Sequence, residues 1–130
     1  MLVKTLNDME VPWNPKEGKA KKRSKPHQRC IDLLTKMFPA CVIVNEVTIP
    51  GTRLRIDIWL PMYKTILEVD GIQHTTKSSF FHEHNCDFDQ QKKNDKMKEE
   101  FARRNNLGFA RLDDDEPDSL WQDKILKAIQ

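Results

Sequence analysis

The sequence predicts an α/β domain in which a mixed central sheet is flanked by helices. Three observations lead to this fold class: an apolar stripe of helical period before residue 39, three strand-like runs between residues 41 and 69, and a helix–strand–helix pattern in the last third. With 130 residues, the chain is long enough to bury one core and too short for two. We therefore expect one domain with helices on the faces of its sheet.

The first 23 residues predict a basic, extended N-terminal arm that precedes the domain over residues 24–130. Pro12, Pro15 and Gly18 interrupt this segment, which has no sustained apolar period, and Trp13 is a candidate anchor. Residues 1–29 hold eight lysines and arginines against three acids, although the net charge of the chain is only +2. A positively charged N-terminal segment on an otherwise nearly neutral chain is typical of a nucleic-acid contact or of a solvated tail.

One helix and three strands should follow the arm. The helix runs from about Lys25 to Phe38, ends at Pro39, and has a core face formed by Cys30, Leu33, Leu34, Met37 and Phe38. The strands are CVIVNEVTI, RLRIDIWL and TILEV, because the first and third are β-branched and apolar and the second alternates strictly. Pro50-Gly51 and PMYK separate them, and Gly71 ends the third.

The C-terminal part predicts a loop, a charged helix, a strand and a last helix. Residues 75–87 have no period and form the loop. The charged helix covers about residues 87–105, with Phe88, Met97 and Phe101 as its sparse apolar contacts, and LGFARL is the fourth strand. Asp118 or Ser119 should cap the last helix. Its inward residues would be Leu120, Trp121, Ile125 and Ile129.

The second and third strands predict a hairpin that places two acids side by side. If residues 61–64 form the turn, Leu60 faces Thr65, Asp57 faces Glu68, and Arg55 faces Asp70. Alternation then gives one apolar face made of Leu54, Ile56, Ile58, Leu60, Leu67 and Val69. The other face holds Arg55, Asp57, Trp59, Ile66, Glu68 and Asp70.

Two carboxylates directly opposite each other, with Cβ atoms about 5 Å apart, destabilise a sheet unless something compensates them. A divalent cation could bridge them, a base such as Arg55 or Lys98 could neutralise them, or one could stay protonated. Hard oxygen ligands favour Mg²⁺ or Mn²⁺, which complete their shells with water and phosphate oxygens. This composition is typical of a site that cleaves phosphodiesters.

An Asp on one strand, ten intervening residues and a Glu on the next resemble the PD-(D/E)XK nuclease superfamily. TRLRIDIWLPMYKTILEVDGIQH, FFH and QQKKNDKMKEEFARRNNLGFARL are similar to a phage and bacterial subgroup related to very-short-patch-repair and EDxHD homing endonucleases. The resemblance covers about residues 24–112. It implies a restriction-endonuclease-like fold and a Mg²⁺-dependent DNA endonuclease in which Mn²⁺ substitutes and a metal-activated water attacks the phosphodiester.

The resemblance also assigns roles to individual residues. Asp57 would be the central metal ligand, Glu68 the second and the Val69 carbonyl a third. His74 would act near the scissile phosphate, and Asp95 would be the last acid, with Lys98 one helical turn beyond. Glu46 matches the leading glutamate, while the first helix offers Gln28 where an acid would be expected.

Asp70 stands where the superfamily has its usual lysine, two positions after the second acid. Lys98 or Lys93 could replace that lysine, His74 could take over the proton transfer, or activity could be lost. The last case is the alternative function: a non-catalytic module that binds DNA or a partner protein. Each of these residues alone has an ordinary structural explanation, and Lys98 could simply pair with Asp95 on a helix surface.

DNA is the expected partner, alongside a homodimer mate or a targeting protein. Sequence-independent phosphate contacts would come from Lys19, Lys21, Lys22, Arg23, Lys25 and Arg55. A small zinc site at His82, His84 and Cys86 is a weaker hypothesis, since no second ligand cluster accompanies it. The sequence has no long apolar run, so we expect a cytoplasmic protein of a bacterial or phage-infected cell that does not enter a membrane.

Overall fold

The structure is a computed structural model that describes residues 1–18, 23–71 and 85–130, with side chains omitted for residues 85–88. A four-stranded sheet forms its centre, in the order β3-β4-β5-β6. The strands are β3 (Val44–Thr48), β4 (Arg55–Leu60), β5 (Thr65–Asp70) and β6 (Gly108–Asp113). The first three strands are antiparallel and β6 runs parallel to β5, so the predicted mixed sheet is confirmed.

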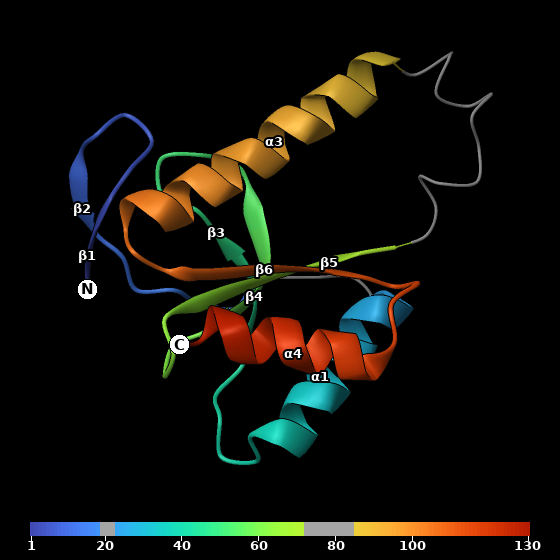
Figure 1. Ribbon diagram of the computed structural model, residues 1–130. Helices are drawn as coiled ribbons and strands as arrows, with labels where there is room; N and C mark the ends of the chain where they lie inside the picture. Colours follow the sequence, from blue (N-terminus) through green and yellow to red (C-terminus); the bar gives the residue numbers. More distant parts are fainter. Residues whose placement is uncertain (19–22, 72–84) are drawn as a thin grey trace.

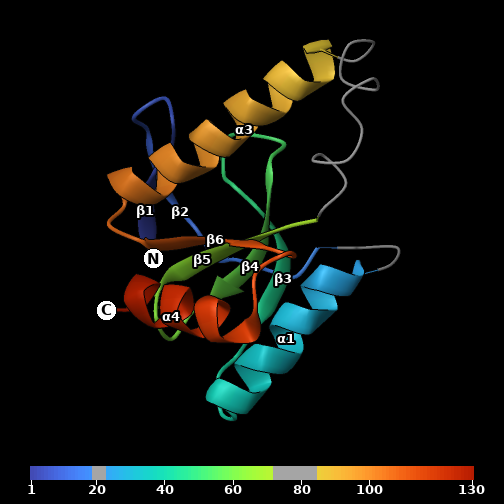
Figure 2. The same ribbon diagram turned by 45° about the vertical axis from the view of Figure 1, so that its right-hand side comes forward.

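Helices cover both faces of this sheet. Figure 1 shows α3 (Asn85–Arg104) on one face, with α1 (Lys25–Met37) and α4 (Asp118–Ala128) on the other. The turned view in Figure 2 gives the same arrangement of layers. The three helices predicted from the sequence are confirmed, and α1 and α3 agree with their predicted bounds within two residues at each end.

Two hydrophobic clusters hold the layers together. On the α3 side, Trp13 packs against Trp59 and Phe101 with ring centroids 4.9 and 5.3 Å apart. On the other side, the cluster joins α1 and α4 to the sheet through Cys30, Leu33, Leu34, Ile58, Leu60, Leu67, Ala110, Leu112, Trp121 and Ile125. Fully burying one large apolar side chain contributes about 1.5 to 3 kcal/mol.

The two helices on this side differ in how their starts are stabilised. Ser24 caps α1, since its hydroxyl accepts a hydrogen bond from the His27 N–H at 3.3 Å. The expected cap of α4 is wrong: Pro117 occupies the N-cap position, and the Asp118 carboxylate instead pairs with Arg29 at 2.7 Å. Leu120 was expected inside but is 38% exposed, whereas Trp121 and Ile125 are the buried residues of this helix.

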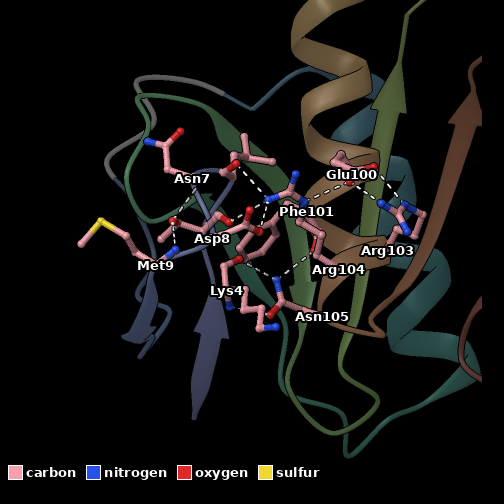
Figure 3. A network of polar contacts seen from close by, with 11 residues as sticks. Lys4, Asn7, Asp8, Met9, Glu100, Phe101, Arg103, Arg104 and Asn105 are labelled. Carbon is pink, nitrogen blue, oxygen red and sulfur yellow. Dashed lines mark hydrogen bonds and ion pairs between the residues drawn. The ribbon is translucent and has the colours of Figure 1, made fainter.

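The N-terminal segment contains a hairpin, which differs from the extended arm expected from the sequence. Strands β1 (Leu2–Lys4) and β2 (Glu10–Pro12) pair antiparallel, and Val3 is buried in the α3-side core together with the expected anchor Trp13. The end of α3 fastens the hairpin (Figure 3). Arg104 donates to the carbonyls of Thr5 and Leu6 and to the Asp8 carboxylate.

The register of the β4–β5 hairpin agrees with the prediction, but the predicted faces are partly wrong. Leu60 pairs with Thr65 and Ile58 with Leu67, as expected. Ile56, however, packs in the same cluster as Trp59, whereas Ile58 packs on the opposite face. Leu54 shares this error, because it also packs on the α3 side.

An interruption in the alternation of side chains between the two faces of the sheet explains why Leu54 and Ile56 lie on the face opposite to the predicted one. Glu46 of β3 has a left-handed backbone with φ of 55°, and it lies between the ladder pairs Asn45–Ile58 and Val47–Ile56. Within the described strands, Asp57 of β4 has no partner in either ladder, and its N–H donates to the side chain of Glu68 on β5. Both strands therefore change phase at one point, and that point carries two acids.

Membrane insertion finds no support in the helices. Among the residues that the structure describes, no helix is both long enough and apolar enough to cross a bilayer.

Candidate metal centre

The two acids of the central hairpin lie side by side, as the register predicts. Glu68 is 2% exposed, and its Oε2 accepts a hydrogen bond from the Asp57 N–H at 3.0 Å. Asp57 Oδ2 accepts in turn from the Val69 N–H at 2.8 Å. Each carboxylate therefore satisfies a backbone donor of the opposite strand, at the point where the β4–β5 ladder ends.

Lys98 enters this site from α3. Its Nζ lies 2.6 Å from Glu68 Oε1, and both side chains are largely buried. From the described residues, Oε1 accepts no hydrogen bond of regular geometry, so its neighbour in the structure is the ammonium group. Of the three compensations considered from the sequence, a basic side chain is therefore in place.

Compensation by Lys98 is incomplete. Burial raises the pKa of Glu68 to about 8, the neighbouring Asp57 acts in the same direction, and Lys98 opposes both. Burial also raises the pKa of Asp57, while hydrogen bonds involving Glu68 and the Val69 N–H lower it. Without a further cation, the pair therefore favours holding a proton near neutral pH.

Asp57 also belongs to a second group of ligand atoms, on the α1 side of the sheet. His27, Glu46 and Asp57 each offer one ligand atom, and these atoms all lie within 4.8 Å of one another. His27 is 3% exposed on α1, and Glu46 sits at the left-handed residue of β3. The phase change thus turns Asp57 towards α1 while Glu68 meets Lys98 from α3.

His27 is the functional residue that the sequence reasoning missed. The expected contribution of the first helix was sought at Gln28, but Gln28 is exposed and donates to Asp32. One residue along a helix turns the side chain by about 100°, which places His27 inward. His27 lies just inside the start of α1, about one helical turn before the buried Cys30. Extending the apolar stripe of this helix back from Cys30 would have placed His27 on the inward face.

Cys30 lies near this group but is a poor ligand. Burial and, to a smaller extent, the charge of Asp57 together raise the pKa of its thiol to about 12. The thiolate is the form that binds metals. We therefore exclude Cys30 from the candidate ligand set.

Asp70 and Asp95 are brought together, but around a residue that was not predicted. Arg111 of β6 lies 3.6 Å from Asp70, 3.3 Å from Asp95 and 3.2 Å from Glu99. Burial raises the pKa of Asp70, and Arg111 opposes this shift. Asp70 therefore takes part in an ion-pair cluster centred on an arginine, whereas Lys98 is the cation that reaches Glu68.

The remaining predicted residues are dispersed. Arg23 pairs with Glu17 at 3.6 Å, Lys25 is exposed at the start of α1, and Arg55 is exposed on β4. Outside the described residues and side chains lie Lys19, Lys21, Lys22, His74, His82, His84 and Cys86. The assigned role of the Val69 carbonyl stays a prediction.

Comparison of the chain with protein-family models, with curated proteins and with solved structures gave no match. The geometry therefore carries the functional argument. Carboxylates from three strands, an imidazole from one helix and an ammonium group from another converge where the sheet changes phase. Such a donor set suits a divalent cation with oxygen and nitrogen ligands, next to a base that can hold a proton.

Proposed function

We propose that this protein is a DNA endonuclease of the restriction-endonuclease-like fold that requires Mg²⁺ or Mn²⁺. The observation that carries this proposal is the contact of Asp57 with Glu68, whose Oε1 lies 2.6 Å from Lys98 Nζ. The element order supports it as well. The resemblance implies the order helix, antiparallel three-stranded meander, helix and parallel strand. The elements of this chain follow that order.

The site fits a divalent cation on two grounds. One ligand atom each from His27, Glu46 and Asp57 lies within 4.8 Å of the others, and burial raises the pKa values of Asp57 and Glu68 because it penalises their charges. Asp57, Glu46 and His27 would hold the ion, with Glu68 beside them. A bound ion would supply a hydroxide-like water and would stabilise the charge that develops on the phosphate.

Lys98 takes the place of the lysine that the superfamily has on the strand. It approaches Glu68 from α3, while Asp70, at the usual lysine position, is engaged with Arg111. An ammonium group in this position orients a water molecule by hydrogen bonding and balances the carboxylate charge during proton transfer. The departure from the sequence motif is thus compatible with catalysis.

Phosphate contacts would come from exposed cations. Arg23 and Lys25 continue the basic run at Lys19, Lys21 and Lys22, and Arg55 lies near the site on β4. Contacts of this kind are independent of sequence and weaken as salt is added. We expect the enzyme to act on a DNA structure, or with a partner that directs it.

The test is cleavage of supercoiled, nicked and branched DNA in the presence of Mg²⁺ or Mn²⁺. Asp57→Asn and Lys98→Met should each reduce the cleavage rate at least about 100-fold, in the range observed when general acid–base groups are removed. The matched controls Asp123→Asn and Lys96→Met change exposed residues of α4 and α3 and should cleave normally. Equal cleavage by all variants would overturn the site. Retention of DNA without cleavage by the wild-type protein would favour the non-catalytic alternative.

A further inference from the structure

His27 is held on one side by an amide and on the other by two acids. We propose that Asn45 and Glu17 are positioning residues: they fix the proton of His27 on Nε2 and so leave Nδ1 as a nitrogen ligand for a transition-metal cation at Glu46 and Asp57. This inference rests on the cation site of the proposed function and adds a preference for ions that accept nitrogen.

The orientation of Asn45 follows from its neighbour Glu17. Asn45 is 6% exposed, and its Nδ2 donates to Glu17 Oε1 at 2.6 Å. A carboxylate only accepts hydrogen bonds, so the amide must turn its nitrogen to Glu17 and its oxygen away. Glu17 is half-exposed, but the Asn45 amide must have this orientation whenever its side chain contacts the Glu17 carboxylate.

The tautomer of His27 follows from the orientation of Asn45. Asn45 Oδ1 lies 2.8 Å from His27 Nε2, and an amide oxygen has no proton to give. Nε2 must therefore carry the hydrogen, and the neutral ring has its lone pair on Nδ1. Nδ1 lies 3.7 Å from Glu46 Oε1, on the side where the ligand atoms of Glu46 and Asp57 gather.

The backbone fixes this chain of contacts at both ends. The Gly18 N–H donates to the Asn45 carbonyl at 3.1 Å, and a Cβ at position 18 would overlap the Glu46 carbonyl oxygen. Residues 17 and 18 thus pass directly against the left-handed turn of β3. On the other side, Ser24 caps the helix through the His27 N–H.

A site with one imidazole and two carboxylates favours particular ions. Imidazole suits Zn²⁺, Fe²⁺ and Ni²⁺ best; Mn²⁺ also favours oxygen ligands but accepts a nitrogen more readily than Mg²⁺, which prefers oxygen alone. Loss of the correct tautomer should therefore weaken Mn²⁺ binding more than Mg²⁺ binding. Partners that orient a metal-bound histidine typically change metal affinity about 10- to 100-fold.

The tautomer of His27 can be measured directly and without DNA. Long-range proton–nitrogen correlation spectra of the full chain should show His27 as the Nε2–H form at a pH where the ring is neutral. This measurement needs no variant, so folding defects cannot obscure it. An Nδ1–H form would overturn the proposal even in an enzyme that cleaves DNA, whereas the Nε2–H form would stand even if no cleavage occurs.

A set of variants provides the matching functional test, with Mn²⁺ titrated by calorimetry. Asn45→Leu removes the acceptor of the His27 Nε2–H, and Glu17→Gln removes the carboxylate that orients the amide, so each should weaken Mn²⁺ binding about 10-fold or more. Asn45→Asp keeps an oxygen that can only accept from Nε2–H, so it should stay within about 3-fold of the wild type. Binding by Asn45→Leu as tight as that of the wild type would overturn the relay, as would equal effects in a His27→Ala background.

Discussion

Glu68→Gln should remove one large contribution to the pH dependence of the stability of the metal-free protein. Glu68 has a folded-state pKa of about 8 against an ordinary value of 4.5, because it is buried beside Asp57. Between these values the folded chain binds more protons than the unfolded chain, so the free energy of unfolding falls as pH rises. The slope is at most about 1.4 kcal/mol per pH unit. Across the full window, one such group costs at most about 5 kcal/mol.

The variant removes this titration, so it should gain on the wild type as pH rises. We expect the difference in unfolding free energy to grow by about 2 to 4 kcal/mol between pH 5 and pH 8. Urea unfolding with a chelator present, followed by the fluorescence of the buried Trp13, Trp59 and Trp121, measures this difference. Glu10→Gln, at an exposed position of β2, is the control and should run parallel to the wild type. Parallel curves for Glu68→Gln as well would refute the reasoning.

Three further predictions concern metal uptake and packing. Mn²⁺ affinity should rise from pH 6 to 8, by up to about tenfold per pH unit, because loss of the Glu68 proton places a negative charge beside the ligand Asp57. Proton release in calorimetry measures this coupling, and a flat profile would contradict it. Arg104→Ala should make residues 1–18 sensitive to limited proteolysis, unlike the control Arg103→Ala, because Arg104 binds two carbonyls of the hairpin. Gly108→Ala should lower the free energy of unfolding by about 1 to 3 kcal/mol in urea melts, since a Cβ there would overlap the Ala128 carbonyl and lie 2.5 Å from Thr65 Oγ1; an unchanged midpoint would contradict it.

Local pattern was sufficient to predict most of the framework. The stripe around Cys30 and Leu34 fixed the first helix, and the alternation of β4 with the short PMYK turn fixed the hairpin register that joins Asp57 to Glu68. Lys98 was one of the residues considered as a replacement for the usual lysine, and the structure places it at Glu68. Each of these features depends on residues that are close in sequence, or on one short connection.

The features that were missed depend on distant contacts. The left-handed conformation of Glu46 changes the phase of β3 and β4 together, and no period in the sequence reveals it. The N-terminal hairpin is stabilised by Arg104, about 100 residues away, and by the packing of Trp13. His27 acquires its meaning only when Asn45 and Asp57 are brought beside it.

The phase change at Glu46 and Asp57 also determines which elements would have to be transferred together to build this site on another protein. Grafting the β4–β5 hairpin onto another scaffold would move both acids but would leave His27 and Lys98 behind, because these come from opposite helical layers. Such a graft would bring two carboxylates together without the imidazole and the ammonium group that accompany them here. The smallest unit that carries the complete site therefore comprises α1, the β3–β5 meander and α3. Substitutions in either helix that displace His27 or Lys98 would change the surroundings of the same two acids.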